Sequence, residues 1–189
     1  MLHHEISGNG KKPLVLLHGF MENTTIWEEM EAHLSKDFTL IKIDLPGHGK
    51  SKVYQEIHTV ELMAEKVKEV IDALKLEKIN LLGHSLGGYV SLAFAEKFPE
   101  ILESMTLFFS TTVADDDEKK QIRRRSIAVI DENFETFVKT SIPNLFSNNE
   151  KDILEGKIEL AKNIAKSTNK EGVKAAQLGM AERPDRTEI

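Results

Sequence analysis

The pentapeptide Gly83-His84-Ser85-Leu86-Gly87 decides how this sequence of 189 residues folds. An apolar run at 79–82 precedes it and predicts a strand, while 86–98 predicts a helix that stops at Pro99. A serine between a strand and a helix, with a glycine two residues to either side, matches the G-x-S-x-G turn that exposes a serine hydroxyl as a candidate nucleophile. The glycines suit this turn because the serine backbone is strained and side chains across it would collide. A chance match at a helix start is the alternative.

Further short apolar runs predict the rest of a sheet. The runs 14–17, 38–45 and 104–109 are continuous rather than alternating, which is typical of parallel strands covered on both faces. Residues 2–6 predict an antiparallel edge strand that enters a hairpin at Gly8-Asn9-Gly10, because Asn-Gly adopts positive φ at little cost.

Helical patterns lie between these runs. Thr25 and Glu28 form a capping-box match at the start of a first helix, and Thr59 is a candidate N-cap for a second helix from Val60. Strands that alternate with helices predict the α/β fold class, with a mostly parallel sheet and crossover helices.

Charge-rich helical patterns without a strand-like run follow Ser110, and we interpret them as a helical cap. Helices are predicted at 116–131, 132–146, 150–167 and 171–182. The expected organisation is an α/β core at 1–112, the cap at 113–183 and the start of a further core strand at 184–189. The acidic run 115–117 is expected to begin a helix, and the basic run 123–125 to form a solvated face. Candidates for lining a pocket, or equally for packing inside the cap, are Phe134, Phe137, Leu145 and Phe146.

Two companion motifs support the chemistry of the serine turn. His18-Gly19-Phe20 directly follows the strand at 14–17, where a loop can aim the backbone N–H of Phe20 toward Ser85, beside the N–H of Leu86. Two such donors would stabilise the oxyanion that forms when a serine attacks an acyl group. The second companion is the tight loop from Asp44 to Ser51, which reads Asp-Leu-Pro-Gly-His-Gly-Lys-Ser.

These three motifs resemble the α/β-hydrolase fold superfamily, in particular its small esterases, lactonases, haloperoxidase-like enzymes and C–C bond hydrolases. The resemblance spans residues 2–182. It implies Ser85 as the nucleophile and Phe20 and Leu86 as the oxyanion donors. Relatives with an aspartate nucleophile, such as dehalogenases and epoxide hydrolases, are disfavoured by Ser85. Residues expected to support the motifs are His18, Gly19, Gly83, His84 and Gly87.

The resemblance also implies a histidine base after the serine, with an acidic residue between them. The chain has 7 histidines, and all of them precede Ser85: His3, His4, His18, His33, His48, His58 and His84. The stretch 183–189 resembles the approach to the next core strand of the family, so we expect an α/β-hydrolase fold that is incomplete at its C-terminal side. Two alternatives are His18 as the base and a non-catalytic relative that binds a ligand or partner.

Composition narrows the choice of partners and compartment. Lys and Arg number 25 against 31 Asp and Glu, and a net charge of −6 argues against nucleic acid. The Gly-Lys pairs at Gly49 and Gly10 fail the spacing of a phosphate loop. The absence of cysteine suits a reducing compartment, and without a signal sequence or an apolar run of membrane length we expect a cytoplasmic protein with no membrane span.

The sequence therefore predicts a serine hydrolase that acts on a small carboxylic ester or related acyl bond through an acyl-enzyme, with no metal or organic cofactor. Its expected partner is a small-molecule acyl substrate. Self-association is also expected, through the exposed edge of the strand at 104–109.

Overall fold

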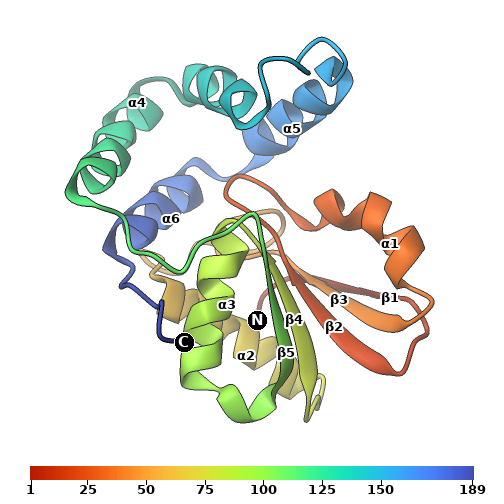
Figure 1. Ribbon diagram of the computed structural model, residues 1–189. Coiled ribbons are helices and arrows are strands. Elements are labelled where there is room, and N and C mark those ends of the chain that lie inside the picture. The colour runs from red at the N-terminus through yellow and green to blue at the C-terminus, as the bar shows by residue number, and fades with distance from the viewer.

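A five-stranded sheet forms the centre of the computed structural model, which describes residues 1–189 (Figure 1). The strand order is β1-β3-β2-β4-β5; β1 runs antiparallel to β3 and all other neighbours are parallel. The predicted α/β class is confirmed. The strands are β1 (His4–Ser7), β2 (Lys12–Leu17), β3 (Phe38–Ile43), β4 (Ile79–His84) and β5 (Leu102–Phe108).

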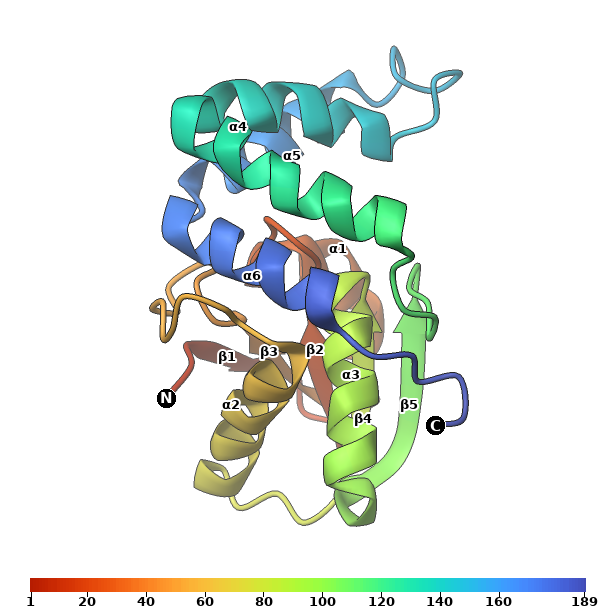
Figure 2. The same cartoon turned by 90° about the vertical axis from the view of Figure 1, so that its left-hand side faces the viewer.

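Helices cover both faces of this sheet. In Figure 2, α2 (Val60–Ala73) and α3 (Leu86–Lys97) lie in front of the sheet and α1 (Glu28–Leu34) lies behind it. The short helices η1 (Thr24–Trp27) and η2 (Pro99–Ile101) precede α1 and β5. Thr59 caps α2 as predicted, because its hydroxyl accepts a hydrogen bond from the Leu62 N–H at 3.1 Å.

Two apolar clusters hold these layers together. The larger has 21 buried residues and joins the sheet to α2 and α3. The smaller surrounds Trp27 on the opposite face, where Leu14, Leu16 and Leu40 pack against it. Burial of one such side chain contributes roughly 1.5–3 kcal/mol, so the two clusters fix how the strands sit between the helices.

A helical cap lies above the carboxyl ends of the parallel strands (Figure 1). It comprises α4 (Asp117–Ser141), η3 (Ile142–Leu145), α5 (Glu155–Ser167) and α6 (Lys170–Glu182). Asn133, at φ −155° and ψ 87°, breaks α4 where the two predicted helices meet, and its side chain accepts a hydrogen bond from the Thr136 N–H at 2.9 Å. Figure 2 shows α6 between α4 and the core.

The cap has an apolar cluster of its own. Phe137 is buried within it and Phe134 and Phe146 pack against it, so these aromatic residues serve the interior of the cap, whereas Leu145 is 73% exposed. Met21 of the core also belongs to this cluster, and Phe20 packs against it. The cap therefore rests on the loop that follows β2.

Two expectations near the amino terminus are wrong. β1 pairs with β3 rather than forming a hairpin with β2, because the Gly8 to Gly10 loop packs on residues 35–38. A Cβ on Gly10 would lie 2.0 Å from the Asp37 carbonyl carbon. Thr25 is not the cap of the first helix, because Asn23 caps η1 by accepting a hydrogen bond from the Thr25 N–H at 3.0 Å.

The start of the cap is less solvated than its charges suggest. Asp116 caps α4 as an acidic helix start should, but Asp115 is buried between Arg123 and Arg183. The expectation of a solvated face at Arg123 is therefore wrong: its guanidinium also donates to the Gln177 side chain of α6 at 3.2 Å. Burial raises the pKa of Asp115, but the hydrogen bond and charge of Arg123, together with the charge of Arg183, outweigh it and leave this pKa below its usual value.

Residues 184–189 contain no strand, although the start of one was expected there. Arg186 draws this segment over the helices instead, because its guanidinium donates to Glu61 of α2 at 2.6 Å and to Glu96 of α3 at 2.8 Å. β5 pairs with β4 alone and forms an edge of the sheet. No helix in the structure has both the length and the apolar character needed to cross a membrane.

Candidate active site

Ser85 occupies the turn between β4 and α3 with a backbone that few serines adopt, at φ 50° and ψ −110°. The end of β5 holds this turn: the Ser85 N–H donates to the Phe108 carbonyl at 3.0 Å, and the Ser110 hydroxyl donates to the Ser85 carbonyl at 2.8 Å. A positive φ at a non-glycine residue is strained and persists only where the surroundings impose it. The turn therefore presents a half-buried serine at the carboxyl edge of the sheet.

The two glycines of the motif allow the strand, turn and helix to meet. A Cβ on Gly83 would lie 2.3 Å from the Gly87 carbonyl oxygen, and a Cβ on Gly87 would lie 2.2 Å from the Leu17 carbonyl oxygen. Real Cβ atoms do not approach backbone oxygens so closely. The packing of α3 on β2 and β4 thus depends on the absence of both side chains.

The loop after β2 lies beside this turn and is also strained. Met21 has φ 59°, and its side chain is buried in the cap cluster. The Glu22 N–H closes the loop onto the Gly19 carbonyl at 3.3 Å, and none of the loop's hydrogen bonds uses the Phe20 N–H. Leu86, as the first residue of α3, likewise has no intrahelical acceptor for its N–H.

His18 is buried and already committed through both ring nitrogens. Its Nε2 accepts a hydrogen bond from the Leu45 N–H at 2.9 Å, so the ring proton resides on Nδ1, which donates to the Gly19 carbonyl at 2.7 Å. Burial lowers the pKa of His18. This arrangement argues against His18 as the base for Ser85 and explains its place in the motif, where it joins the loop after β2 to the loop after β3.

Two further histidines are held inside the structure. His48 is buried with its Nδ1 donating to the Pro46 carbonyl at 3.0 Å, and burial, reinforced by the neighbouring His18, lowers its pKa to about 3. His58 is buried as well, its Nε2 accepts from the Tyr54 N–H at 3.1 Å, and burial lowers its pKa. None of the histidine hydrogen bonds in the structure reaches Ser85.

Two carboxylates at this edge were not predicted as site residues: Asp44 was named only as the first residue of a loop motif, and Glu22 was not named. Asp44 is buried at the end of β3 and accepts from the backbone of Thr24 and Lys50, each at 2.9 Å, and from His3 at 2.9 Å. Glu22 accepts from the Gly19 N–H at 2.6 Å and from His84 Nδ1 at 2.9 Å. The position of Asp44 directly after a strand was a usable signal, whereas nothing local marked Glu22.

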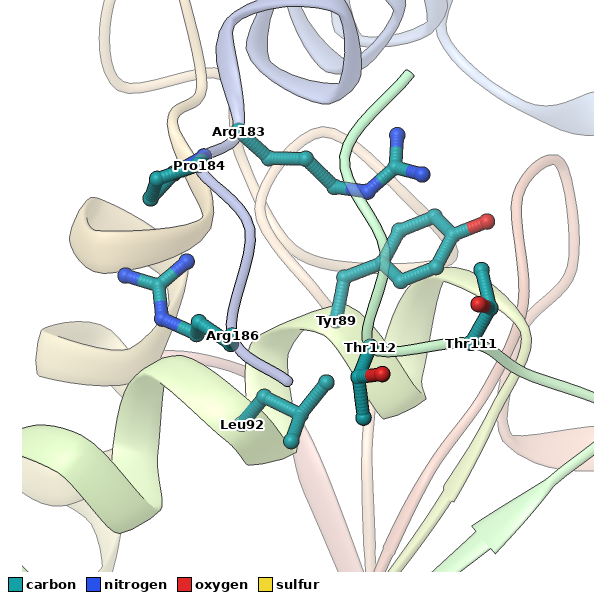
Figure 3. Close-up of a pocket in the computed structure, with 7 residues that line it drawn as sticks. All are labelled: Tyr89, Leu92, Thr111, Thr112, Arg183, Pro184 and Arg186. Atoms are coloured by element: carbon teal, nitrogen blue, oxygen red, sulfur yellow. The ribbon is translucent and has the colours of Figure 1, made fainter. Parts of the chain in front are cut away.

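A separate crevice lies where the carboxyl-terminal segment crosses α3 (Figure 3). The crevice leaves no enclosed room for even a water molecule, whereas ligand pockets begin at roughly 300 Å³. The Arg183 guanidinium lies over the Tyr89 ring at 3.9 Å from its centroid, which fills much of the space. We therefore assign this crevice to packing. Its lining residues are Tyr89, Leu92, Thr111, Thr112, Arg183, Pro184 and Arg186.

Comparison with known proteins identifies the family. The family model described as alpha/beta hydrolase fold matches residues 12–153. The chain belongs to the α/β-hydrolase fold family. A thermophilic esterase from Thermogutta terrifontis, solved with malate bound, is similar to this α/β-hydrolase with a TM-score of 0.93 and 36% identity, over 99% of this chain and 69% of that one.

Other relatives of this α/β-hydrolase differ in their activities. The enol-lactonase from Burkholderia xenovorans LB400 gives a TM-score of 0.90 at 24% identity, over 99% of this chain and 72% of that one, which shows the shared fold. The 2-hydroxy-6-oxononadienedioate/2-hydroxy-6-oxononatrienedioate hydrolase of Escherichia coli is 35% identical over 111 residues, which are 56% of this chain and 38% of that protein. The chain spans only 23% to 38% of the curated relatives it matches.

Proposed function

We propose that this protein hydrolyses a small carboxylic ester or a related acyl bond with Ser85 as the nucleophile. The observation that carries the proposal is the Ser85 backbone, at φ 50° and ψ −110° in a turn where a strand, a helix and two glycines enforce the strain. Backbone strain of this kind concentrates at functional sites. The 36% identity to a thermophilic esterase supports the same class of reaction.

The proposed reaction has two steps and requires no metal or organic cofactor. Ser85 Oγ bonds to the acyl carbon while its proton passes to a base, and the carbonyl π electrons move to oxygen as an oxyanion. The oxyanion collapses and the alkoxide leaves with a proton. Water then attacks the acyl-enzyme by the same route and releases the carboxylic acid.

Two backbone donors are assigned to the oxyanion. The N–H groups of Phe20 and Leu86 lie on the two loops that meet at the carboxyl edge of the sheet, and neither has an acceptor within the protein. Donors that are fixed before the reaction stabilise the developing charge without reorganisation, and loss of one such donor typically costs roughly 100-fold to 1000-fold in kcat.

No base is assigned, because no histidine ring forms a hydrogen bond with Ser85, and the rings of His18, His48, His58 and His84 bond to other groups. This same observation favours a second candidate function, a non-catalytic relative that keeps the site for binding a ligand. The two differ in whether Ser85 forms a covalent acyl or phosphonyl bond.

A fluorophosphonate probe with free imidazole as an external base separates these functions. We expect a phosphonyl adduct on the peptide that contains Ser85, formed faster as imidazole rises, and no adduct in Ser85→Ala. Circular dichroism of both proteins establishes that they are folded. A folded wild-type protein that stays unmodified at saturating imidazole would favour the binding function.

A further inference from the structure

We propose that Glu22 is a positioning residue that clamps the two oxyanion loops together; this inference rests on the function proposed for Ser85. One oxygen of its carboxylate, Oε2, accepts two hydrogen bonds, from the Gly19 N–H at 2.6 Å and from His84 Nδ1 at 2.9 Å. Gly19 directly precedes Phe20, and His84 directly precedes Ser85. A single atom thus links the loop that carries one oxyanion donor to the turn that carries the nucleophile and the other donor.

The clamp holds the loop that carries Glu22 in a strained backbone conformation. Met21 lies between Phe20 and Glu22 with φ 59°, a conformation that costs energy in any residue with a side chain. Its side chain is buried in the cap cluster, so the cap holds the loop from one side and the Glu22 carboxylate holds it from the other. Without the carboxylate, the loop is free to relax toward negative φ and to move the Phe20 N–H.

The clamp leaves no room for a side chain on Gly19 unless Glu22 or His84 moves. A Cβ on Gly19 would lie 2.7 Å from Glu22 Oε2 and 2.9 Å from His84 Nδ1, so the glycine is what allows both donors to reach one oxygen. Glu22 and His84 are each about a quarter exposed, at 25% and 23%, and lie at the surface of the site rather than in the core. The clamp is therefore reachable by mutation without removal of core packing.

The hydrogen bond also dictates which ring nitrogen of His84 carries the proton. A carboxylate only accepts, so His84 Nδ1 must be the donor, and in the neutral ring Nε2 is then unprotonated. This is the less common tautomer in free histidine, and ¹⁵N chemical shifts distinguish the two. The Phe108 and Phe109 rings pack around His84, at 5.7 Å and 6.5 Å between centroids, and restrict its rotation.

The proposal is tested with four variants of the whole chain. Glu22→Gln keeps an oxygen at the same reach, whereas Glu22→Ala removes it and Gly19→Ala displaces it. Glu28→Ala is the matched control, because Glu28 is exposed in the first turn of α1 and forms no ion pair. The assay is the imidazole-assisted acylation of Ser85 by a p-nitrophenyl ester. We expect the acylation rate constant to be 10-fold to 100-fold lower in Glu22→Ala and Gly19→Ala, while the ester concentration at half-saturation stays unchanged. The rate constant of Glu22→Gln should lie within a few-fold of the wild-type value, and that of Glu28→Ala should equal the wild-type value.

Nuclear magnetic resonance tests the clamp without any catalysis. We expect the Nδ1-protonated His84 tautomer and slow exchange of the Gly19 N–H in wild type and Glu22→Gln, and loss of both in Glu22→Ala. If Glu22→Ala retains the wild-type tautomer, Gly19 exchange and acylation rate, the clamp is refuted. If instead wild-type Ser85 fails to acylate while the tautomer and exchange respond to Glu22→Ala, the clamp stands and the proposed hydrolase function fails.

Discussion

Substitution of Gly83 by alanine probes how closely β4 and α3 meet at the Ser85 turn. The new Cβ would lie 2.3 Å from the Gly87 carbonyl oxygen and 2.4 Å from Ser91 Oγ. Ser91 can rotate, but the Gly87 backbone cannot retreat, because Gly87 itself is in close contact with the Leu17 carbonyl. The turn must therefore open by roughly 1.1 Å to bring the new contact from 2.3 Å to 3.4 Å, where ordinary van der Waals contact begins.

The expected cost follows from overpacking in a tightly packed site. Extra methyl groups in such sites destabilise by about 1–3 kcal/mol, and the upper end applies here because the obstacle is backbone. In a domain of this size each kcal/mol lowers the Tm by about 2–4 °C, so Gly83→Ala should lower it by about 6–12 °C. Acylation of Ser85 should fall by about 100-fold, because a displacement near 1 Å spoils the attack geometry.

Thermal unfolding and probe labelling of Gly83→Ala and Gly156→Ala form the assay. A Cβ on Gly156, in α5, meets no atom within 4 Å. Alanine is favoured over glycine in a helix by about 0.5–1 kcal/mol, so this control should raise the Tm by about 1–4 °C and leave labelling unchanged. A Gly83→Ala protein with wild-type Tm and labelling would refute the account of the turn.

Three further outcomes are expected. Asp115→Asn breaks the buried ion pairs with Arg123 and Arg183 and should lower the free energy of unfolding in urea by about 3–5 kcal/mol. Since the pKa of Asp115 is lowered below 3.8, the stabilisation in wild type should persist above pH 4 and disappear only at lower pH. Loss of this stabilisation already at pH 6 would be inconsistent with the pairing. The pKa of His48 is about 3 in the folded protein and near 6.5 in the unfolded chain, so unfolding takes up a proton at a pH between these values. The free energy of unfolding of wild type should therefore fall by about 1.2 kcal/mol through this group from pH 7.0 to 5.5, and this fall should be absent from His48→Asn. Equal falls in both proteins would argue against the buried neutral ring. We also propose that two copies associate through the free edge of β5, beside which Phe109 is 81% exposed; sedimentation velocity should show dimers that Phe109→Ser weakens, and a concentration-independent wild-type monomer would count against it.

The sequence predicted the centre of the sheet well because buried parallel strands are continuous apolar runs. The strand before Ser85 was expected at 79–82 and is found at Ile79–His84. β5 was placed less well: it begins at Leu102, two residues before the predicted run, because the exposed Glu103 separates Leu102 from the rest of the run and gives no apolar signal. Burial on both faces made the pattern readable, and exposure at the edge removed it.

Predictions failed where distant packing overrides local preference. Gly8-Asn9-Gly10 has the composition of a hairpin turn, yet its contacts with residues 35–38 send β1 to β3. Asp115 sits in an acidic run typical of a solvated helix start, yet Arg183, 68 positions further along the chain, buries it. Periodicity and capping patterns carry no information on such pairings.

In the candidate site, too, features that are local in the sequence could be predicted and features that depend on distant contacts could not. Ser85 and its glycines are adjacent in sequence, so their geometry could be inferred from the motif alone. The engagement of His18 with the Leu45 N–H and the link from Glu22 to His84 join residues that are 27 and 62 positions apart. Only the fold brings these groups into contact.

A crystal structure of the protein phosphonylated at Ser85 would show directly whether the two backbone donors face the nucleophile. We expect the phosphonyl oxygen to lie about 2.7–3.1 Å from the N–H nitrogens of both Phe20 and Leu86, with Glu22 still hydrogen-bonded to Gly19 and His84. A phosphonyl oxygen directed into solvent, or an adduct on a residue other than Ser85, would contradict this expectation.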